Sequence, residues 1–324
     1  MYNDIKLEKG LYNLSEKSFT SALEELDPSS AYCGTPMEKL DAFERQLKRF
    51  NIRIAGQGCD RVEKFFTSTE TAVLFPEFVT RCIKKGFDDT LLSSVCAAQT
   101  VSGSSQYLGC VLDDSAEYST SAQSTTLPTT TVKESSTATT LLKYGRLINA
   151  SYEAVRQQRL DVFGVMLKSI GVKLAVAVVK NAVSVLKTGA SSITATSLTY
   201  DSLAKLYGSF NCFNMTTVIA SPESASKIVA MDQLSDTSAD ADGRMILPFG
   251  SELVKTSALD ENTIIGIDRN FALEFITSSN LVMETDKLID RQLDQITVSI
   301  TCGFRKITSD AVKVLTISTS TTTA

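Results

Sequence analysis

One stretch, Ser151 to Gly189, constrains the fold more than any other part of this 324-residue chain. Ser151 can accept a hydrogen bond from an unpaired amide of a first helical turn, and Glu153 places a carboxylate near the positive end of the helix dipole. Lys187 stands near the other end, and Gly189 is the residue type that stops helices in the left-handed conformation. The pattern predicts a single helix over 151–189, about 50–55 Å long at 1.5 Å per residue.

The polar residues of this stretch form one stripe. Five polar residues recur at helical spacing: Ser169, Lys173, Lys180, Ser184 and Lys187. Valines and leucines fill much of the remaining helix surface. The lysines, with Lys168, interrupt every window of about 20 residues that would have to be apolar in a membrane span. We therefore expect a water-soluble helix with one wet side and no membrane partner. A core helix of any α+β protein would show the same periodicity.

Composition excludes the commonest catalytic systems. The chain contains no histidine, which removes Ser-His and Cys-His nucleophiles and histidine metal ligands. It also has no Walker loop, no Gly-x-Gly-x-x-Gly turn opening a helix and no Gly-x-Ser-x-Gly elbow. Its seven scattered cysteines include no Cys-x-x-Cys pair, so no zinc site or disulfide framework is indicated. We expect no cofactor and no enzymatic activity. A histidine-free α+β enzyme that uses Lys, Tyr, Asp or Glu stays open as an alternative.

The net charge and the N-terminal segment limit which partners and which cellular location we expect for the protein. The net charge is −5, and because nucleic-acid affinity comes mainly from basic residues, tight sequence-independent DNA binding is not expected. Residues 1–13 lack the basic start and apolar run of a signal peptide.

The loop 236–243 contains Asp240 and Asp242 and invites comparison with a calcium loop. Phe249 stands where the bidentate glutamate would have to be, so we expect a solvated loop.

The stretch between Asp113 and Thr140 differs in composition from the rest of the chain. About half of its residues are serine or threonine, which would suit a disordered linker. Its β-branched residues also suit extended strands, and Leu127-Pro128 would make a bend at the middle. Because a two-stranded ribbon is only marginally stable alone in water, an ordered ribbon must lie on something else, most simply another copy of the protein.

Helices are expected before this stretch and short strands after the long helix. Thr35-Pro36-Met37-Glu38 predicts a helix start with Thr35 as N-cap, and a further helix beginning at Val73 is expected to end at Gly86. From residue 264 onward the sequence predicts five strands: Ile264–Ile267, Ala272–Thr277, Leu281–Glu284, Ile296–Cys302 and Val312–Ile317. The fold class is therefore α+β.

Seven segments, spread in order over nearly the whole chain, carry a resemblance to a known family: LEELDPSS (23–30), LDAFERQLKRFNI (40–52), VLFPEFVTRCIKKGF (73–87), KYGRLINASYEAVRQQRLD (143–161), ILPFGSELV (246–254), IIGIDRNFALEF (264–275) and DKLIDRQLDQITVSITCGFRKI (286–307). They resemble the major capsid proteins of tailed bacteriophages (Caudoviricetes), which have the Hong Kong phage capsid fold, and especially those of phages that infect Firmicutes. No segment is diagnostic alone.

The resemblance implies a division of the chain. Residues 1–90 would be a helical N-terminal arm, and residues 91–146 would be an extended β-ribbon similar to the E-loop of the family, which lies across a neighbouring subunit. The P-domain would comprise the spine helix within 147–195 and the strands within 272–317. The A-domain would occupy 196–271, and residues 318–324 would be a tail.

The implied function is mechanical. The protein would assemble with itself, through pentamers and hexamers, into an icosahedral shell that encloses double-stranded DNA. It would be made and assembled in the host cytoplasm and located in the virion capsid, with portal, scaffolding or decoration proteins as further partners. An encapsulin-like nanocompartment shell is the alternative, although the long N-terminal segment and the Ser/Thr-rich ribbon favour the phage capsid.

The resemblance also suggests residues that would contact neighbouring subunits. Leu127, Pro128, Lys133 and Glu134 of the ribbon are the first set. Asp240 and Asp242 would lie in an A-domain loop near a symmetry axis. Some family members join a ribbon lysine covalently to an asparagine of a neighbour, and Lys133 with Asn280 would be the candidate pair here. No motif supports this pair, and ordinary ion pairing of Lys133 is the favoured alternative.

Overall fold

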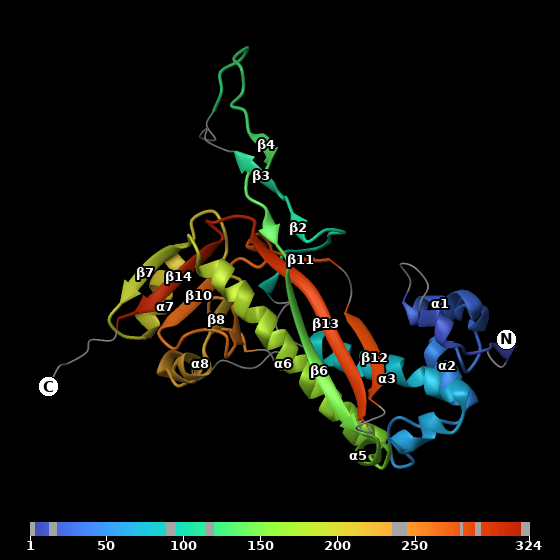
Figure 1. Ribbon diagram of the computed structural model, residues 1–324. Helices are drawn as coiled ribbons and strands as arrows, with labels where there is room; N and C mark the ends of the chain where they lie inside the picture. Colours follow the sequence, from blue (N-terminus) through green and yellow to red (C-terminus); the bar gives the residue numbers. More distant parts are fainter. Residues whose placement is uncertain are drawn as a thin grey trace. The chain divides into compact units, whose positions relative to one another are not determined.

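The computed structural model describes residues 4–12, 18–88, 95–113, 120–234, 245–278, 281–288 and 293–318. The chain forms two compact units, each assembled from three separate parts of the sequence. The first unit comprises residues 1–89, 145–174 and 281–299, and the second comprises 90–144, 175–280 and 300–324. Figure 1 shows the order of the elements along the chain.

Three helices form the N-terminal part of the first unit: α1 (Phe19–Leu26), α2 (Ala42–Arg49) and α3 (Thr69–Asp88). Short 3-10 helices occur at Lys9–Tyr12, Ser29–Tyr32 and Val62–Phe66 in this unit, and at Asp232–Leu234 in the second. The helix start predicted at Thr35 is wrong. Glu38 accepts a hydrogen bond from the Gly34 amide, and residues 36–39 form turns. The capping box belongs instead to Asp41 and Glu44, which open α2.

Charged side chains inside the first unit hold the N-terminal helices together. The Arg45 side chain is fully buried, and its Nε donates to Oδ2 of Asp27 at 2.6 Å. Arg81 of α3 donates to Glu77 at 2.9 Å and to Asp41 at 2.5 Å, and its guanidinium lies over the Phe43 ring. Phe43, which is 1% exposed, therefore packs within the first unit.

The long helix predicted over 151–189 is wrong in its first part. The structure has a short helix α5 (Tyr152–Arg156) and then α6 (Leu160–Lys187), which is about 42 Å long. Tertiary pairing causes the break, because Gln158 accepts from the Val62 amide and the Leu160 amide donates to Asp60. Backbone groups that would continue a helix are thus used elsewhere. Ser151 ends strand β6 (Leu142–Ser151), and its side chain caps nothing.

The far end of α6 and its polar stripe agree with the sequence-based expectation. Gly189 has a φ of +67°, the left-handed stop that was predicted. The five residues of the polar stripe are exposed, whereas Val178, Val179, Val183 and Leu186 are buried. The expectation that lysines interrupt every apolar window is not met, because by length and composition alone α6 could cross a membrane. Of its most apolar 18-residue window, 39% is buried in the protein.

Two glycines allow α3 and α6 to cross closely in the first unit. A Cβ atom on Gly86 would collide with the carbonyl oxygen of Lys168, and one on Gly171 would collide with the carbonyl oxygen of Ile83. The prediction that Gly86 ends this helix is therefore wrong. Gly86 lies inside α3, which continues to Asp88. The aromatic cluster of Phe65, Phe75 and Phe163 packs in the same unit.

The first sheet is built on one long strand, β13 (Leu293–Lys306). In the first unit, β13 pairs with β12 (Val282–Leu288), and β6 is also a neighbour of β13. In the second unit, residues 302–306 of β13 pair with β11 (Leu273–Thr277), which lies parallel to β1 (Ala98–Val101). The strands predicted at 272–277 and 281–284 are confirmed, and the strand predicted over 296–302 is longer than expected.

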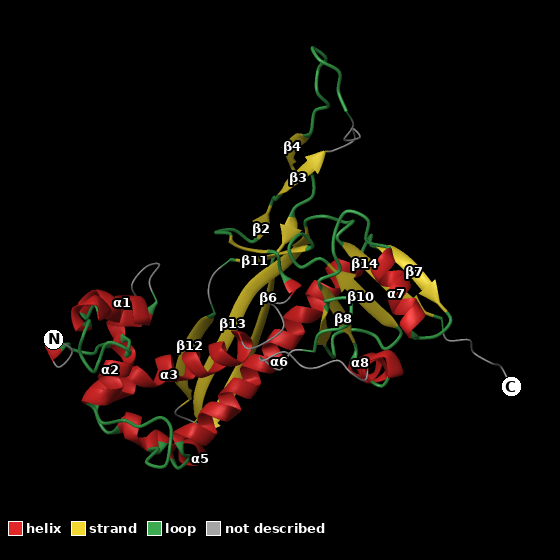
Figure 2. Ribbon diagram, turned by 180° about the vertical axis from the view of Figure 1, so that it is seen from behind, coloured by secondary structure: helices red, strands yellow, loops and turns green. Residues whose placement is uncertain are grey.

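The second sheet lies wholly in the second unit. Its strands follow the order β7 (Ser191–Ala195), β14 (Val312–Ile317), β10 (Thr263–Ile267), β8 (Thr217–Ala220) and β9 (Glu252–Lys255). Helices α7 (Tyr200–Gly208) and α8 (Pro222–Val229) pack on this sheet (Figure 2). Because side chains alternate along a strand, Val218 and Ala220 join the core beneath these helices, whereas Ile219 faces the C-terminal part of α6.

Candidate functional site

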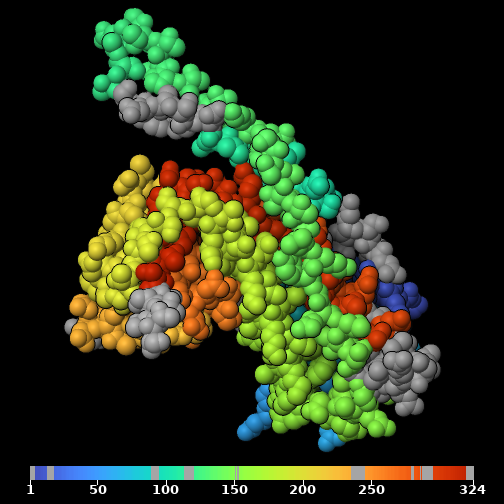
Figure 3. Space-filling model, turned by 60° about the vertical axis from the view of Figure 1, so that its left-hand side comes forward, coloured from blue at the N-terminus to red at the C-terminus, as the bar shows by residue number. Residues whose placement is uncertain are grey.

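A two-stranded ribbon, residues 106–140, extends from the second unit. Strand β2 (Gln106–Tyr107) pairs antiparallel with β5 (Thr139–Thr140) at its base. Further out, β3 (Cys110–Asp113) pairs antiparallel with β4 (Thr131–Glu134). Figure 3 shows this part of the chain, in green, as a finger that stands away from the rest of the unit. The Ser/Thr-rich segment therefore forms paired β-strands near the base of the ribbon, and residues 120–130 have no regular structure apart from a turn.

Large apolar side chains of the ribbon are open to solvent. Leu112 and Val132 lie directly opposite each other in the pairing of β3 with β4, and each is 64% exposed. Leu127, beyond the strands, is 70% exposed. Cross-strand apolar pairs stabilise a sheet when they are buried, and this pair is not buried in the single chain. These apolar side chains of the ribbon are therefore left uncovered in the single chain.

The base of the ribbon is fixed by a buried carboxylate, Glu274 of β11. Its Oε1 accepts hydrogen bonds from Thr100 Oγ1 at 2.6 Å and from the Tyr107 hydroxyl at 3.0 Å. Its Oε2 accepts from Arg305 Nε, also at 3.0 Å. Thr100 belongs to β1 and Tyr107 to β2, so one side chain ties the entry of the ribbon to the sheet.

Arg305 extends this anchor to the outer strands. Its Nη1 donates to the carbonyl oxygen of Cys110, the first residue of β3, at 2.8 Å. Gly109 lies so close to the Arg305 guanidinium that a side chain there would collide with it. On the return side, the Ser135 amide donates to the Gly109 carbonyl and Leu141 is buried. The orientation of the ribbon is therefore set by contacts at its base.

The protonation states at this anchor follow from the same contacts. Burial raises the pKa of Glu274, but the hydrogen bonds from Thr100, Tyr107 and Arg305 and the positive charge of Arg305 outweigh it, so the net pKa is lowered. Burial and the bond to Glu274 raise the pKa of Tyr107. At neutral pH the anchor is thus a carboxylate that accepts from a neutral phenol and a guanidinium.

The structure places four of the six predicted contact residues on the ribbon. Lys133 and Glu134 are in β4, opposite Val111 and Cys110, and both are exposed. Leu127 and Pro128 are exposed but make no bend.

The described turn lies upstream of Leu127 and Pro128. There the Thr125 amide donates to the Ala122 carbonyl and Ser124 has a φ of +65°. Asp240, Asp242 and the proposed cross-linking residue Asn280 lie outside the described residues.

Sequence reasoning missed Glu274 and Arg305. A signal for Glu274 was present, because it stands in the otherwise apolar run Ala272-Leu273-Glu274-Phe275-Ile276, whose residues are all buried. A lone carboxylate in such a strand needs a specific partner. The partner could not be read from the sequence, since the register that sets Glu274 opposite Arg305 is a tertiary feature.

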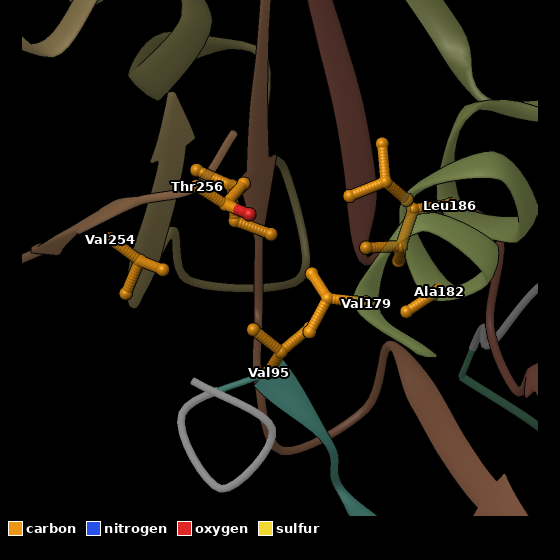
Figure 4. A pocket seen from close by; sticks show the side chains of 8 residues that line it. Val95, Val179, Ala182, Leu186, Val254 and Thr256 are labelled. Carbon is orange, nitrogen blue, oxygen red and sulfur yellow. The ribbon is translucent and has the colours of Figure 1, made fainter. Parts of the chain in front are cut away.

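Among the described residues, an enclosed cavity lies between α6 and the second sheet, and its volume of about 10 Å³ is far too small for a metabolite. Figure 4 shows that its lining is aliphatic apart from Thr256. Two larger hollows are open to solvent, one beside Lys187 and Asp260 and the other beside Lys227 and Glu261. In the same described part of the chain, no three Cys, Asp or Glu side chains gather as a metal site would require.

Several solved structures are similar to this one. The virus-like particle of Pyrococcus furiosus aligns with a TM-score of 0.52 at 12% identity, over 74% of this chain and 99% of that chain. The capsid of a native GTA particle aligns with a TM-score of 0.52 at 13% identity, over 72% of this chain and 91% of that one. The SrpI encapsulin of Synechococcus elongatus PCC 7942 gives 0.51 at 13% identity, over 68% and 84%.

No protein-family model and no curated protein matches the sequence. The structural likeness shows the fold. This chain has the α+β Hong Kong phage capsid fold, which phage capsid and encapsulin subunits share, as the sequence predicted.

Proposed function

We propose that this chain is the subunit of a closed protein shell, and specifically the major capsid protein of a tailed phage of the type that infects Firmicutes. The observation that carries the proposal is the ribbon, with Leu112 and Val132 paired and open to solvent above a hydrogen-bonded base. Such a limb gains stability only when a second molecule covers it. Head-to-tail contacts of this kind close into rings and shells.

The parts of the fold suit these roles. The described ribbon lies within the proposed E-loop (91–146), and helices α1 to α3 form the proposed arm (1–90). Helix α6 is the proposed P-domain spine (147–195), with strands from 272–317. Helices α7 and α8 belong to the proposed A-domain (196–271). The shell would contain pentamers and hexamers, with Leu127, Pro128, Lys133 and Glu134 at subunit contacts. Asp240 and Asp242 would face a symmetry axis.

The proposed content of the shell is double-stranded DNA, held without tight sequence-specific binding. A net charge of −5 suits a container from which a genome must leave. The ordered helices α1 to α3 ahead of the ribbon favour a phage capsid over an encapsulin-like compartment. No catalytic role is proposed. Portal, scaffolding and decoration proteins would be further partners in the virion, after assembly in the host cytoplasm.

Electron microscopy of particles purified from cells that produce the protein naturally tests this proposal. A phage capsid predicts icosahedral particles that protect double-stranded DNA of uniform length from nuclease. Particles that hold a protein cargo and no protected DNA would favour the encapsulin alternative. A soluble monomer with catalytic turnover would favour the enzyme and overturn the shell.

A further inference from the structure

From residue 162 onward, α6 carries positive charge and no negative charge. Between residues 162 and 188 the sequence has four lysines and no acidic residue, in a chain whose net charge is −5. Three of these lysines, Lys173, Lys180 and Lys187, are exposed and follow one another at intervals of seven residues. Seven residues are close to two turns, so on one continuous helix the three side chains share a side and lie about 10.5 Å apart along the axis. We call these three residues the lysine row.

The helix surface between these lysines is polar or small. From residue 173 to residue 188, the exposed residues of this segment are Lys173, Ala177, Lys180, Ser184, Lys187 and Thr188. None of them is a large apolar residue. The centre of a stable contact between proteins is apolar, and lysine is depleted from it. The lysine row therefore does not suit the surface of another protein, and its partner has to be recognised by charge.

The spacing of the lysine row fits the phosphates of double-stranded DNA. An interval of about 10.5 Å corresponds to roughly three base pairs at 3.4 Å each, so each lysine meets a different phosphate. Lysine binds phosphate as a point charge, and such contacts do not depend on the base sequence. Lys187 is paired with Asp260 at 2.7 Å, but these side chains are 38% and 76% exposed. Because exposed ion pairs contribute little stability, a phosphate can take the place of this carboxylate.

We propose that the lysine row is the surface through which each subunit contacts the phosphate backbone of the double-stranded DNA inside the shell. The inference rests on the proposed function and adds the residues of the contact. It also places the exposed side of α6 on the inner side of the shell. Three contacts in one subunit are weak, as release of the genome requires, and many subunits act together on one DNA molecule.

Formaldehyde treatment of intact wild-type particles tests this contact in the unaltered protein. Formaldehyde joins lysine amines to neighbouring DNA bases, and mass spectrometry after nuclease and protease digestion locates the nucleotide adducts. The lysine row should carry severalfold more adducts than Lys205 and Lys227, controls whose side chains are 67% and 58% exposed. In particles that contain DNA, adducts concentrated at other lysines, or crosslinks from the lysine row to a protein instead, would overturn this contact and leave the shell function standing. Particles without DNA would overturn both the contact and the proposed content of the shell.

The salt dependence of DNA binding provides an independent readout. A short labelled duplex is added to the full-length chain before assembly, and fluorescence anisotropy measures binding. Three phosphate contacts predict a slope of log affinity against log salt of about −2.7, which is an about 40-fold loss of affinity between 50 and 200 mM salt. Lys180→Gln should reduce the slope to about −1.8 and the loss to about 12-fold, because one contact is removed. Lys180→Arg keeps the charge and should behave like wild type.

Lys205→Gln is the matched control for this measurement, because Lys205 is an exposed lysine outside the row. Its slope should equal that of wild type. If Lys180→Gln also keeps the wild-type slope, the lysine row does not contact DNA. Circular dichroism of each variant confirms that it is folded.

Discussion

Glu274 and Arg305 lie directly opposite each other on β11 and β13, and Nε and Nη2 of the arginine both contact Oε2 of the carboxylate at 3.0 Å. The carboxylate is almost wholly buried, with 5% of the residue exposed. The remaining donors to Glu274 come from β1 and from the first strand of the ribbon. This ion pair therefore joins the sheet of the second unit to the limb that we propose reaches a neighbour.

Glu274→Gln should destabilise the protein by about 2–3 kcal/mol at pH 7, because it leaves the Arg305 charge at a site that is mostly buried. Urea unfolding followed by circular dichroism measures this change. The particle yield should fall as well, since the base of the ribbon loses its anchor. Glu252→Gln, at a looser ion pair of 3.5 Å with the more exposed Arg269, is the control and should change stability by less.

Glu274 should also make the stability of the protein depend on pH. The pKa of Glu274 is lowered from 4.5 in the folded protein. The stability that its charge contributes is therefore present above pH 4.5, and it is lost as the pH falls through the lower pKa of the folded state. The stability difference between wild type and Glu274→Gln should therefore shrink progressively below about pH 4.5. A difference that stays constant from pH 7 to pH 3 would show that the carboxylate contributes no charge-dependent stability.

Gly171→Ala should destabilise the first unit by about 2–3 kcal/mol, because the new methyl group would meet the Ile83 carbonyl of α3. Gly164→Ala is a close control on the same helix. Its Cβ would lie 3.4 Å from Cys82 Sγ, an ordinary contact, and alanine favours a helix by up to about 1 kcal/mol over glycine. Thermal unfolding of both variants distinguishes them. Equal midpoints would mean that the two helices do not cross as described.

Cysteine labelling should separate the thiols by burial. Cys33, Cys110 and Cys212 are exposed and should react quickly with iodoacetamide at pH 8. Burial raises the pKa of Cys82 to about 11 and those of Cys96 and Cys302 to about 12, so these three should react slowly. Peptide mass spectrometry after a short exposure measures each site. Rapid labelling of Cys302 in folded protein would contradict its buried position in β13.

Replacing residues 111–133 by a short Gly/Ser linker should leave a folded subunit that forms no particles. The reason is that Leu112, Leu127 and Val132 contribute little to the core of the single chain, being 64% to 70% exposed. The midpoint of thermal unfolding should change by a few degrees at most, whereas velocity sedimentation should show only small species. The intact chain, prepared in parallel, is the control. Normal particles from the shortened chain would show that the ribbon is a linker.

Local sequence signals predicted the regular elements of the second unit well. The strand predicted at Ile264–Ile267 matches β10 to within one residue, and the one at Val312–Ile317 matches β14. β10 is buried along its whole length, and β14 buries Val312, Val314 and Leu315, so β propensity and packing favour the same structure in both strands. The left-handed stop at Gly189 was likewise predictable, because few other residues adopt that conformation at low cost.

The predictions that failed concern features set by contacts with residues far away in the sequence. Helix propensity extends through Gln157–Arg159, but pairing with residues 60–62 interrupts it there. Gly86 was predicted to end a helix because sequence spacing does not reveal that α6 crosses α3 at that point. The ribbon was predictable from its composition, whereas its anchor was not, since Glu274 and Arg305 are brought together by strand register alone.

The mass of the purified wild-type chain in solution tests the central claim most directly. Mass photometry at neutral pH should find closed particles on the order of a megadalton or more, as a shell of many identical subunits requires. A chain of 35.1 kDa that stays monomeric at every concentration and salt condition tested would contradict the proposal that this protein builds a shell.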